Sequence, residues 1–320
     1  MHDAGHVPVM GEEVLHALSP QPGHVVVDCT AGRGGHAEML ARRVGPTGTL
    51  VLFDLDAGNL AFAEARVRAV PEPPKVVPVH ANFERVGPEL RSRGLQANAV
   101  LADLGFASTQ MDDPERGFAF SQPGPLDMRL DRSSGMTAAD LLASIRETDL
   151  ADLIYELGED PFSRRIARSI VERRVAGALK TTQDLADAVL RAYGSRARNS
   201  RMHPATRTFM AIRIAVNREL ESLDNYLATL GEACRVGSEG EATWLAMQSR
   251  VAILSFHSLE DRSIKRAMVE WERHGWATRL HRKPQVASET EQRQNPRSRS
   301  AKLRAIRVQP RTEESSRQGW

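Results

Sequence analysis

Short apolar stretches alternate with amphipathic stretches through the first 110 residues. Each apolar stretch is rich in β-branched side chains and is bounded by glycine, proline or polar residues, as is typical of a buried parallel strand. Each amphipathic stretch has the apolar spacing of a surface helix. The pattern therefore predicts a doubly wound parallel sheet. Its expected strands are 24–29, 49–54, 75–80 and 99–104, and its expected helices are 35–44, 57–70 and 84–93.

The alternation stops after residue 110. Residues 111–131 contain three prolines and two glycines and are too long for an ordinary connection, which indicates an ordered functional loop. Helical segments follow: Thr137 has Asp140 three residues on, as in a capping box, and a helix is expected from Thr182 to Tyr193. We therefore expect residues 111–202 to form a mainly helical insertion in the sheet domain.

The sheet pattern resumes beyond residue 203. Apolar residues at spacings of three and four predict one long amphipathic helix that begins at Pro204 and continues past Leu227 to Leu230. A buried strand at 250–256 and a final strand at 302–308 follow, and Ser258 with Asp261 has the spacing of a helix cap. The expected sheet domain is thus discontinuous, made of residues 1–110 and 203–320.

Composition narrows the class of protein. The chain has 320 residues, 41% of them hydrophobic, and no apolar run as long as a membrane span. The amino terminus lacks both a basic segment and an apolar signal core, so we expect a cytoplasmic protein with no membrane partner. Cys29 and Cys234 lack the spacing of metal ligands, and we expect each to be a small core residue rather than part of a metal site.

The net charge of +2 conceals an asymmetry. Residues 161–218 carry 13 Lys and Arg against 3 Asp and Glu, and residues 262–320 carry 15 against 6, so the rest of the chain carries −17. Separated basic regions on an acidic protein favour a polyanion as partner, with nucleic acid the first candidate. An arginine-rich solvated surface remains the alternative.

The segment DCTAGRGGH, Asp28 to His36, carries the clearest chemistry. Glycines 32, 34 and 35 allow a tight strand-to-helix turn and a close approach of backbone to ligand. Asp54 follows about 20 residues later at the end of the next strand, where a carboxylate accepts hydrogen bonds from ribose hydroxyls. Because parallel strands end at one edge, Asp28, Asp54 and Asp103 are expected to converge. The turn also satisfies a dinucleotide fingerprint, and a turn without any ligand is a further alternative.

Eight motifs in order closely resemble the bacterial 16S ribosomal RNA cytosine-N4 methyltransferases of the MraW family. They are HVPVM, DCTAGRGGH, DLGFASTQMDD, RGFAF, PLDMRLD, HPATRTF, LSFHSLEDR and NPRSRSAKLR, and they span about His6 to Arg307. The resemblance implies a Rossmann-like class I methyltransferase sheet with an inserted, mainly helical second domain for substrate recognition. It also implies S-adenosylmethionine as cofactor and methylation of a cytidine amine in the decoding region of 16S rRNA, within the assembled 30S subunit.

The resemblance also implies which residues contact the cofactor. Asp54 would hold the ribose and Phe83 would offer an apolar face to adenine. Asp103 and Gln110 would order the groups around the methionine end, and Asp103 is also the expected catalytic acceptor for the cytosine amine. The residues that match the family's cofactor contacts are Gly34, Gly35, His36, Asp54, Phe83, Asp103 and Gln110.

Other features leave room for alternatives. Many amino-methylating enzymes have Asp/Asn-Pro-Pro-aromatic where this chain has Asp103 followed by Leu, Gly and Phe, so a different way of holding the amine is required. His257 follows a strand, either as a base or substrate contact or as a loop histidine bonded to backbone. A nicotinamide dehydrogenase would leave the basic regions unexplained. A noncatalytic ribosome-assembly factor would not need the acids at 54 and 103.

Overall fold

The chain folds as two compact units. A computed structural model describes residues 8–106, 108–199 and 202–310. The first unit contains the described residues up to Gly105 and from Leu220 onward, and the second runs from Phe106 to Glu219. The second unit is therefore longer at both ends than the helical insertion 111–202 expected from sequence. Within the described residues, none of the helices combines the length and the apolar character needed to cross a membrane.

A seven-stranded sheet with the order β3-β2-β1-β4-β5-β7-β6 forms the centre of the first unit. The first five strands in chain order are parallel, whereas β7 pairs antiparallel with both β5 and β6. The predicted strands are confirmed with shifts of one or two residues at their ends, except that β5 begins five residues before the predicted 250–256, and the short β6 was not predicted. The strands are β1 (Val25–Asp28), β2 (Thr49–Asp54), β3 (Lys75–His80), β4 (Ala97–Asp103), β5 (Leu245–Ser255), β6 (Ala277–Arg279) and β7 (Lys302–Val308).

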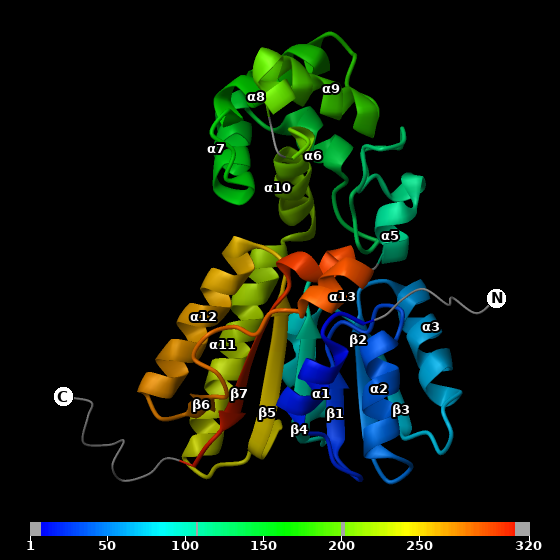
Figure 1. Cartoon of the computed structure of the whole chain (residues 1–320), viewed down its shortest axis with the longest axis vertical. Helices are drawn as coiled ribbons and strands as arrows, with labels where there is room; N and C mark the ends of the chain where they lie inside the picture. Colours follow the sequence, from blue (N-terminus) through cyan, green and yellow to red (C-terminus); the bar gives the residue numbers. More distant parts are fainter. Residues whose placement is uncertain (1–7, 107, 200–201, 311–320) are drawn as a thin grey trace. The chain divides into compact units, whose positions relative to one another are not determined.

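Helices cover both faces of this sheet, as Figure 1 shows. Successive strand residues point to opposite faces, so Val26 belongs to one apolar cluster and Val27 to the other. The first cluster includes residues of α1 (Gly11–Leu18), α2 (Gly35–Val44) and α3 (Ala57–Arg68). The second includes residues of α4 (Val86–Ser92), α11 (Glu219–Ser238) and α12 (Ser258–Arg273). This three-layer arrangement leaves the carboxyl edge of the strands for chemistry.

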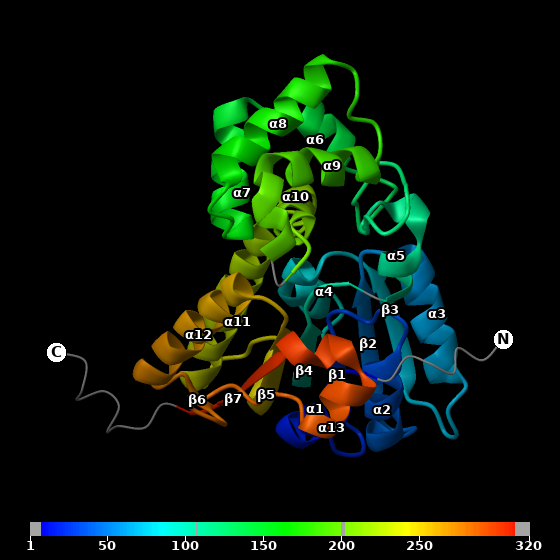
Figure 2. The ribbon, with the colours of Figure 1, turned by 45° about the horizontal axis from the view of Figure 1, so that its top comes forward.

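The second unit is mainly helical (Figure 2). It has its own apolar core. Capping boxes begin two of its helices, at Thr137 with Asp140, as predicted, and at Thr181 with Asp184. Ile154, Ile170 and Phe209 come from three different helices and are buried in the same core. The helices are α5 (Ser108–Asp112), α6 (Ala138–Ser144), α7 (Glu147–Gly158), α8 (Ser163–Val175), α9 (Thr182–Tyr193) and α10 (Ala205–Asn217), with 3₁₀ turns η2 (Pro114–Arg116) and η3 (Gly194–Asn199).

The prediction of one helix from Pro204 to Leu230 was wrong. Helix α10 ends at Asn217, and Arg218 adopts a left-handed conformation with φ of 50° before α11 begins. The apolar spacing continues through this residue because α10 and α11 each bury an apolar face, but in different units. Periodicity alone does not reveal a break of one residue.

The side chain of Asn217 orders the long loop that follows residue 111. Its Nδ2 donates to the carbonyl of Met128 at 2.7 Å, and its Oδ1 accepts from the amide of Leu130 at 2.7 Å. Met128 is fully buried and has a left-handed φ of 60°. An asparagine on α10 thus satisfies backbone groups of a segment that has no strand partner there.

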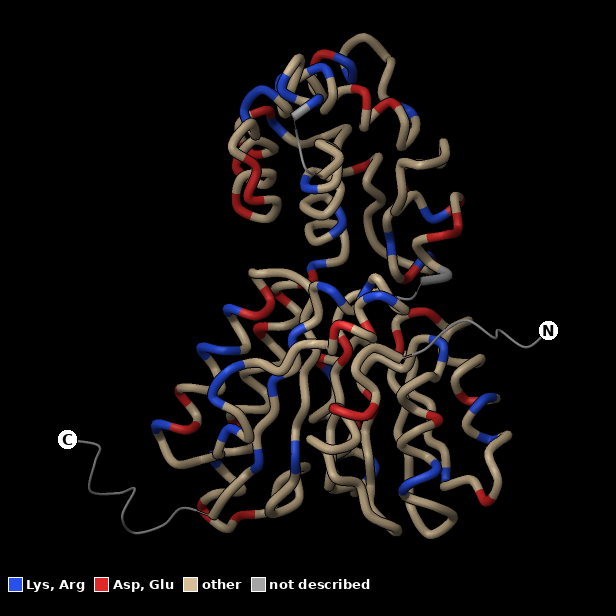
Figure 3. Tube along the Cα trace, in the orientation of Figure 1, with Lys and Arg blue, Asp and Glu red and all other residues tan. Residues whose placement is uncertain are grey.

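Charged residues are segregated on the second unit. Figure 3 shows basic positions along α8 and acidic ones along α7. Helix α8 contains five arginines and one glutamate, whereas α7 contains two aspartates and two glutamates. Helix α8 thus carries five of the 13 Lys and Arg of residues 161–218.

Candidate functional site

The glycine turn after β1 is shaped by backbone contacts. The amide of Ala31 donates to the carbonyl of Phe53 on β2 at 2.8 Å, and the amide of Gly34 donates to Ala31 at 2.8 Å. Gly34 has φ of 75°, and a Cβ there would lie 2.9 Å from the Cα of Ala63. Only glycine meets both demands, because other residues lose energy in the left-handed region and would clash with the helix behind.

Asp54 joins this turn to the end of β2. Its Oδ2 accepts from the amide of Gly32 at 2.7 Å, and its Oδ1 accepts from the amide of Asp56 at 2.7 Å. Burial raises the pKa of Asp54 to about 6, although these two hydrogen bonds oppose the shift. Each carboxylate oxygen has a second lone pair, so Asp54 can hold the turn and still accept a hydrogen bond from a ligand hydroxyl.

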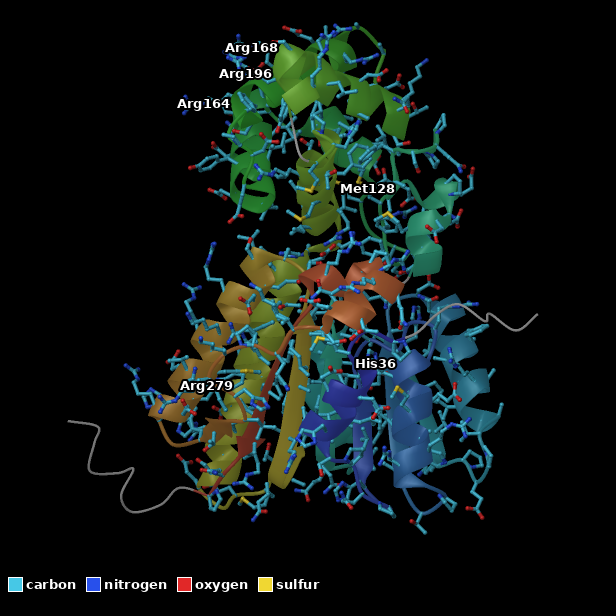
Figure 4. All side chains as sticks on the ribbon, in the orientation of Figure 1. His36, Met128, Arg164, Arg168, Arg196 and Arg279 are labelled. Carbon is cyan, nitrogen blue, oxygen red and sulfur yellow. The ribbon has the colours of Figure 1, made fainter. Side chains whose placement is uncertain are left out.

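His36, labelled in Figure 4, bridges two acceptors at the start of α2. Its Nε2 lies 2.9 Å from the carbonyl oxygen of Val9, and its Nδ1 lies 3.4 Å from Oδ2 of Asp103. A carbonyl only accepts, so Nε2 carries a proton, and a carboxylate favours a second proton on Nδ1. Burial lowers the pKa of His36, but the hydrogen bond and charge of Asp103 outweigh it, and the net pKa is raised.

Two buried carboxyl oxygens at this edge lack donors. Among the described residues, Oδ2 of Asp28 and Oδ1 of Asp103 are buried without a hydrogen-bond partner. Asp28 ends β1 with 1% of its surface exposed, and burial raises its pKa to about 7 despite the opposing charge of His36. Buried acceptors of this kind call for a donor or a cation, since leaving them unpaired is costly. A cofactor with a positive charge fits this chemistry.

Phe83 lies in the 3₁₀ turn η1 (Phe83–Arg85) after β3. Its half-buried ring meets Tyr226 edge to face, with centroids 5.3 Å apart. The Cys29 sulfur lies 3.9 Å from the Tyr226 hydroxyl, which places this cysteine in the core beneath the aromatic pair. Phe83 thus has a fixed ring that can offer an apolar surface to a planar base.

The structure brings together five of the seven residues expected from sequence. Gly34, Gly35 and His36 form the turn and first residues of α2, while Asp54 and Asp103 end β2 and β4, the two strands that flank β1. A Cβ on Gly35 would lie 3.3 Å from Pro8, so this glycine allows the amino-terminal segment to pack closely. Phe83 belongs to the same unit, after β3, whereas Gln110 is buried on α5 in the second unit.

The predicted cap of the helix after β5 was wrong by one residue. His257, rather than Ser258, is the N-cap of α12, and its Nδ1 accepts from the amide of Glu260 at 3.5 Å. Asp261 lies on the same helix and accepts from Arg304 at 2.7 Å and from Lys302 at 3.0 Å. These polar residues therefore fasten α12 to β7.

Sequence reasoning missed the backbone partners of the site. It did not foresee that the carbonyl of Val9 would hold His36, or that the hydroxyl of Thr30 would accept from the amide of Asp103 at 2.6 Å. Val9 belongs to the short motif HVPVM near the amino terminus. This motif has no helical or strand period, so it did not predict the contact with His36.

Fold and site together define an S-adenosylmethionine-dependent methyltransferase of class I. The strand order with an antiparallel seventh strand, the glycine turn after β1 and the acid at the end of β2 are the features of that class. The family model described as "MraW methylase family" matches residues 3–309. The chain belongs to this family.

Curated relatives match over nearly the whole chain. A protein named "Ribosomal RNA small subunit methyltransferase H" from Syntrophobacter fumaroxidans is 39% identical and covers 95% of this chain and 96% of its own length. A protein of the same name from Sorangium cellulosum is 45% identical, and the match covers 94% of this chain and 90% of that protein. Among solved structures, a putative rRNA methylase from Clostridium thermocellum is 10% identical with a TM-score of 0.42, over 96% of this chain and 99% of that one.

Proposed function

We propose that this protein methylates the N4 amine of a cytidine in the decoding region of 16S rRNA, within the assembled 30S subunit in the cytoplasm. The observation that carries the chemical part is Asp103, which ends β4 with one oxygen facing His36 and the other buried without a partner among the residues that the structure describes. The names of the full-length relatives support small-subunit ribosomal RNA as the substrate.

The cofactor is assigned to the carboxyl edge of β1, β2 and β4. Gly34, Gly35 and His36 provide a turn in which the backbone can approach the ligand. Asp54 accepts hydrogen bonds from the ribose, and the ring of Phe83 packs against adenine. Bound S-adenosylmethionine supplies a methyl group made electrophilic by a sulfonium.

The methionine end is assigned to Asp103 and Gln110. Asp28 adds a second buried carboxyl group at the same edge, with its Oδ2 unpartnered among the described residues. The positive groups of the cofactor would be stabilised by Asp28, which is buried, because charge interactions are stronger where water is excluded.

Asp103 is also assigned as the acceptor for the cytosine amine. The amine is a weak nucleophile because its lone pair is delocalised into the ring, so a hydrogen bond to a carboxylate raises its electron density and helps it to lose a proton. The ring of His36, with Nδ1 3.4 Å from Oδ2 of Asp103, fixes the direction of that carboxylate oxygen. The protein's other task is alignment of the amine with the methyl group.

The surroundings of Cys29 and Cys234 argue against methylation of the cytosine ring carbon. That reaction needs a thiolate nucleophile. Burial raises the pKa of Cys29, and burial raises the pKa of Cys234 to about 12, so both thiols stay protonated near neutral pH. Both side chains are also buried in the core of the first unit.

The reaction can be tested with labelled S-adenosylmethionine and undermethylated small subunits. We expect label in 16S rRNA and N4-methylcytidine as the product nucleoside by mass spectrometry. Label in protein alone, no label, or binding of NADH without S-adenosylmethionine would overturn the proposal. Methylation of free rRNA but not of subunits would reject the assembled substrate. A noncatalytic assembly factor would bind subunits without transferring label.

The cofactor assignment has its own test. Asp54→Ala is expected to weaken S-adenosylmethionine binding at least about tenfold in calorimetry, which corresponds to about 1.4 kcal/mol. Glu64→Ala on α3 is a suitable control because Glu64 forms an exposed pair with Arg68. Equal affinity in the two variants would remove Asp54 from the site.

A further inference from the structure

The arginines of the second unit fall into two groups by what they contact. One group holds the unit together. Arg174 donates from Nη1 to the carbonyls of Leu142 at 2.8 Å and Ile145 at 2.7 Å, near the end of α6. Arg173 lies 3.9 Å from Asp184 on α9 and is mostly buried. These two side chains satisfy groups inside the protein.

The second group forms an exposed basic patch. Its members are Arg164, Arg165 and Arg168 on α8, Arg191 on α9 and Arg196 on η3, and all five are exposed. Arg168 lies 3.7 Å from Glu147, with 71% of its side chain exposed, and a screened pair of this kind contributes little to stability.

Contacts between α8 and α9 explain why these arginines lie together. Ser169 donates to the carbonyl of Ala188 at 2.8 Å, and Arg173 approaches Asp184, so residue numbers rise on one helix as they fall on the other. The first half of α8 therefore lies beside the end of α9 and η3.

The ring of Phe162 fixes the last member of the patch. The guanidinium carbon of Arg196 lies 5.8 Å from the centroid of this ring, which directly precedes α8. Figure 4 labels Arg164, Arg168 and Arg196 in one region of the second unit. Arg164, Arg168 and Arg196 thus lie in one region, and the antiparallel packing of α8 against α9 brings Arg191 to the same end of the helix pair.

We propose that the basic patch binds the sugar-phosphate backbone of the RNA substrate, an inference that rests on the function proposed above. Guanidinium groups match phosphate oxygens in pairs, and contacts to phosphate position a nucleic acid without reading its sequence. Neutralised phosphates release counterions, which supplies a large part of the binding energy.

The surroundings of the patch favour RNA over an acidic protein. Protein interfaces usually have an apolar centre. Within the described residues 160–170 and 190–198, no large hydrophobic side chain is exposed, and the exposed Tyr155 and Val175 lie on α7 and at the end of α8. Nucleic-acid interfaces are instead polar and strongly positive.

The test compares two triple variants with the same change in charge. R164Q/R165Q/R168Q removes three members of the basic patch. R43Q/R68Q/R93Q is the control, because these exposed arginines lie at or just beyond the ends of α2, α3 and α4, away from the carboxyl edge of the sheet. Binding of deproteinised small-subunit rRNA is measured at several salt concentrations.

We expect the patch variant to bind rRNA at least about tenfold more weakly and the slope of log K against log salt to fall by about two, since each lost phosphate contact removes about 0.7 to 0.9. R164K/R165K/R168K keeps the charge and should retain most of the slope. The melting midpoint and S-adenosylmethionine affinity should match those of the control.

The outcomes separate this inference from the proposed function. If the wild type methylates subunits but the patch variant equals the control in affinity and slope, only the inference fails. If the patch variant loses affinity for subunits but not for deproteinised rRNA, a ribosomal protein is the partner and the inference is wrong. A wild type that transfers no methyl group contradicts the proposed function, whatever the binding data show.

Discussion

The imidazole of His36 lies between the carbonyl oxygen of Val9, 2.9 Å from Nε2, and the carboxylate of Asp103, 3.4 Å from Nδ1. Both ring nitrogens therefore face acceptors, which favours the doubly protonated ring. A charged histidine in this position links the amino-terminal segment to the acid that we assign to catalysis.

Replacing His36 tests this link. The folded-state pKa of His36 is raised, so its contribution to stability is present below the unfolded value of 6.5 and is lost as pH rises through the folded value. The wild type should exceed His36→Gln in melting midpoint by more at pH 6 than at pH 9. A constant difference across this range would show that the charge of His36 is not involved.

We expect the ionisation of Asp28 to lower the stability of the folded protein as pH rises toward neutral. Its folded pKa of about 7 exceeds the unfolded value of 3.8, so stability falls as pH rises between these values. Asp28→Asn retains the acceptor for the Thr30 amide and removes the ionisation. At pH 8 we expect the free energy of unfolding of Asp28→Asn, measured in denaturant, to exceed that of the wild type by at most about 4 kcal/mol. This difference should close toward pH 4.

A drop in the stability of Asp28→Asn at pH 8 would contradict this account. The same variant should bind S-adenosylmethionine more weakly, because a neutral amide interacts less well with a cationic cofactor. The two opposite effects, on the free protein and on the complex, distinguish a ligand-facing acid from a purely structural one.

Gly34 and Gly94 provide a matched pair of substitutions. Both have a left-handed φ, 75° and 62°, but a Cβ at Gly34 would lie 2.9 Å from the Cα of Ala63, while one at Gly94 meets nothing within 4 Å. Gly94→Ala should cost about 1 kcal/mol, the ordinary cost of that conformation. Gly34→Ala should cost at least about 2 kcal/mol and abolish cofactor binding. Equal costs in urea unfolding would show that the close approach is unimportant.

Asn217 should control the order of the loop after residue 111. Asn217→Asp keeps the acceptor for the Leu130 amide but turns a carboxylate oxygen toward the Met128 carbonyl. We expect a loss of about 1 to 3 kcal/mol, since two acceptors then face each other in a partly buried place. Hydrogen exchange should accelerate at 128–130, whereas the control Asn225→Asp on α11 should leave that segment unchanged. Unaltered exchange in Asn217→Asp would contradict the proposed role.

The sequence predicted the parallel part of the sheet well because each buried strand and its covering helix carries a strong period. It failed where structure depends on single residues. Arg218 breaks a helix whose apolar spacing continues, and His257 rather than Ser258 caps α12. The three-residue β6 is too short to show a period.

The candidate site was predictable to a similar extent. Asp28, Asp54 and Asp103 could be placed at one edge because parallel strands all end there. The contact of His36 with Val9 joins residues 27 positions apart through a backbone carbonyl, which no side-chain pattern encodes. The resemblance of short motifs identified the cofactor, and the geometry supplied the two acceptors that face the ring of His36.

A contact near the cofactor edge joins segments that are translated at very different times. Glu291, on α13 (Glu289–Gln294), accepts from the amide of Met10 at 2.7 Å, next to the residue whose carbonyl holds His36. Strand β7, which is translated later still, completes the sheet beside β5. A nascent chain thus carries its glycine turn for some 250 residues before Glu291, which holds the segment in contact with His36, is translated. We therefore expect the amino-terminal segment to reach its final packing only when translation is nearly complete.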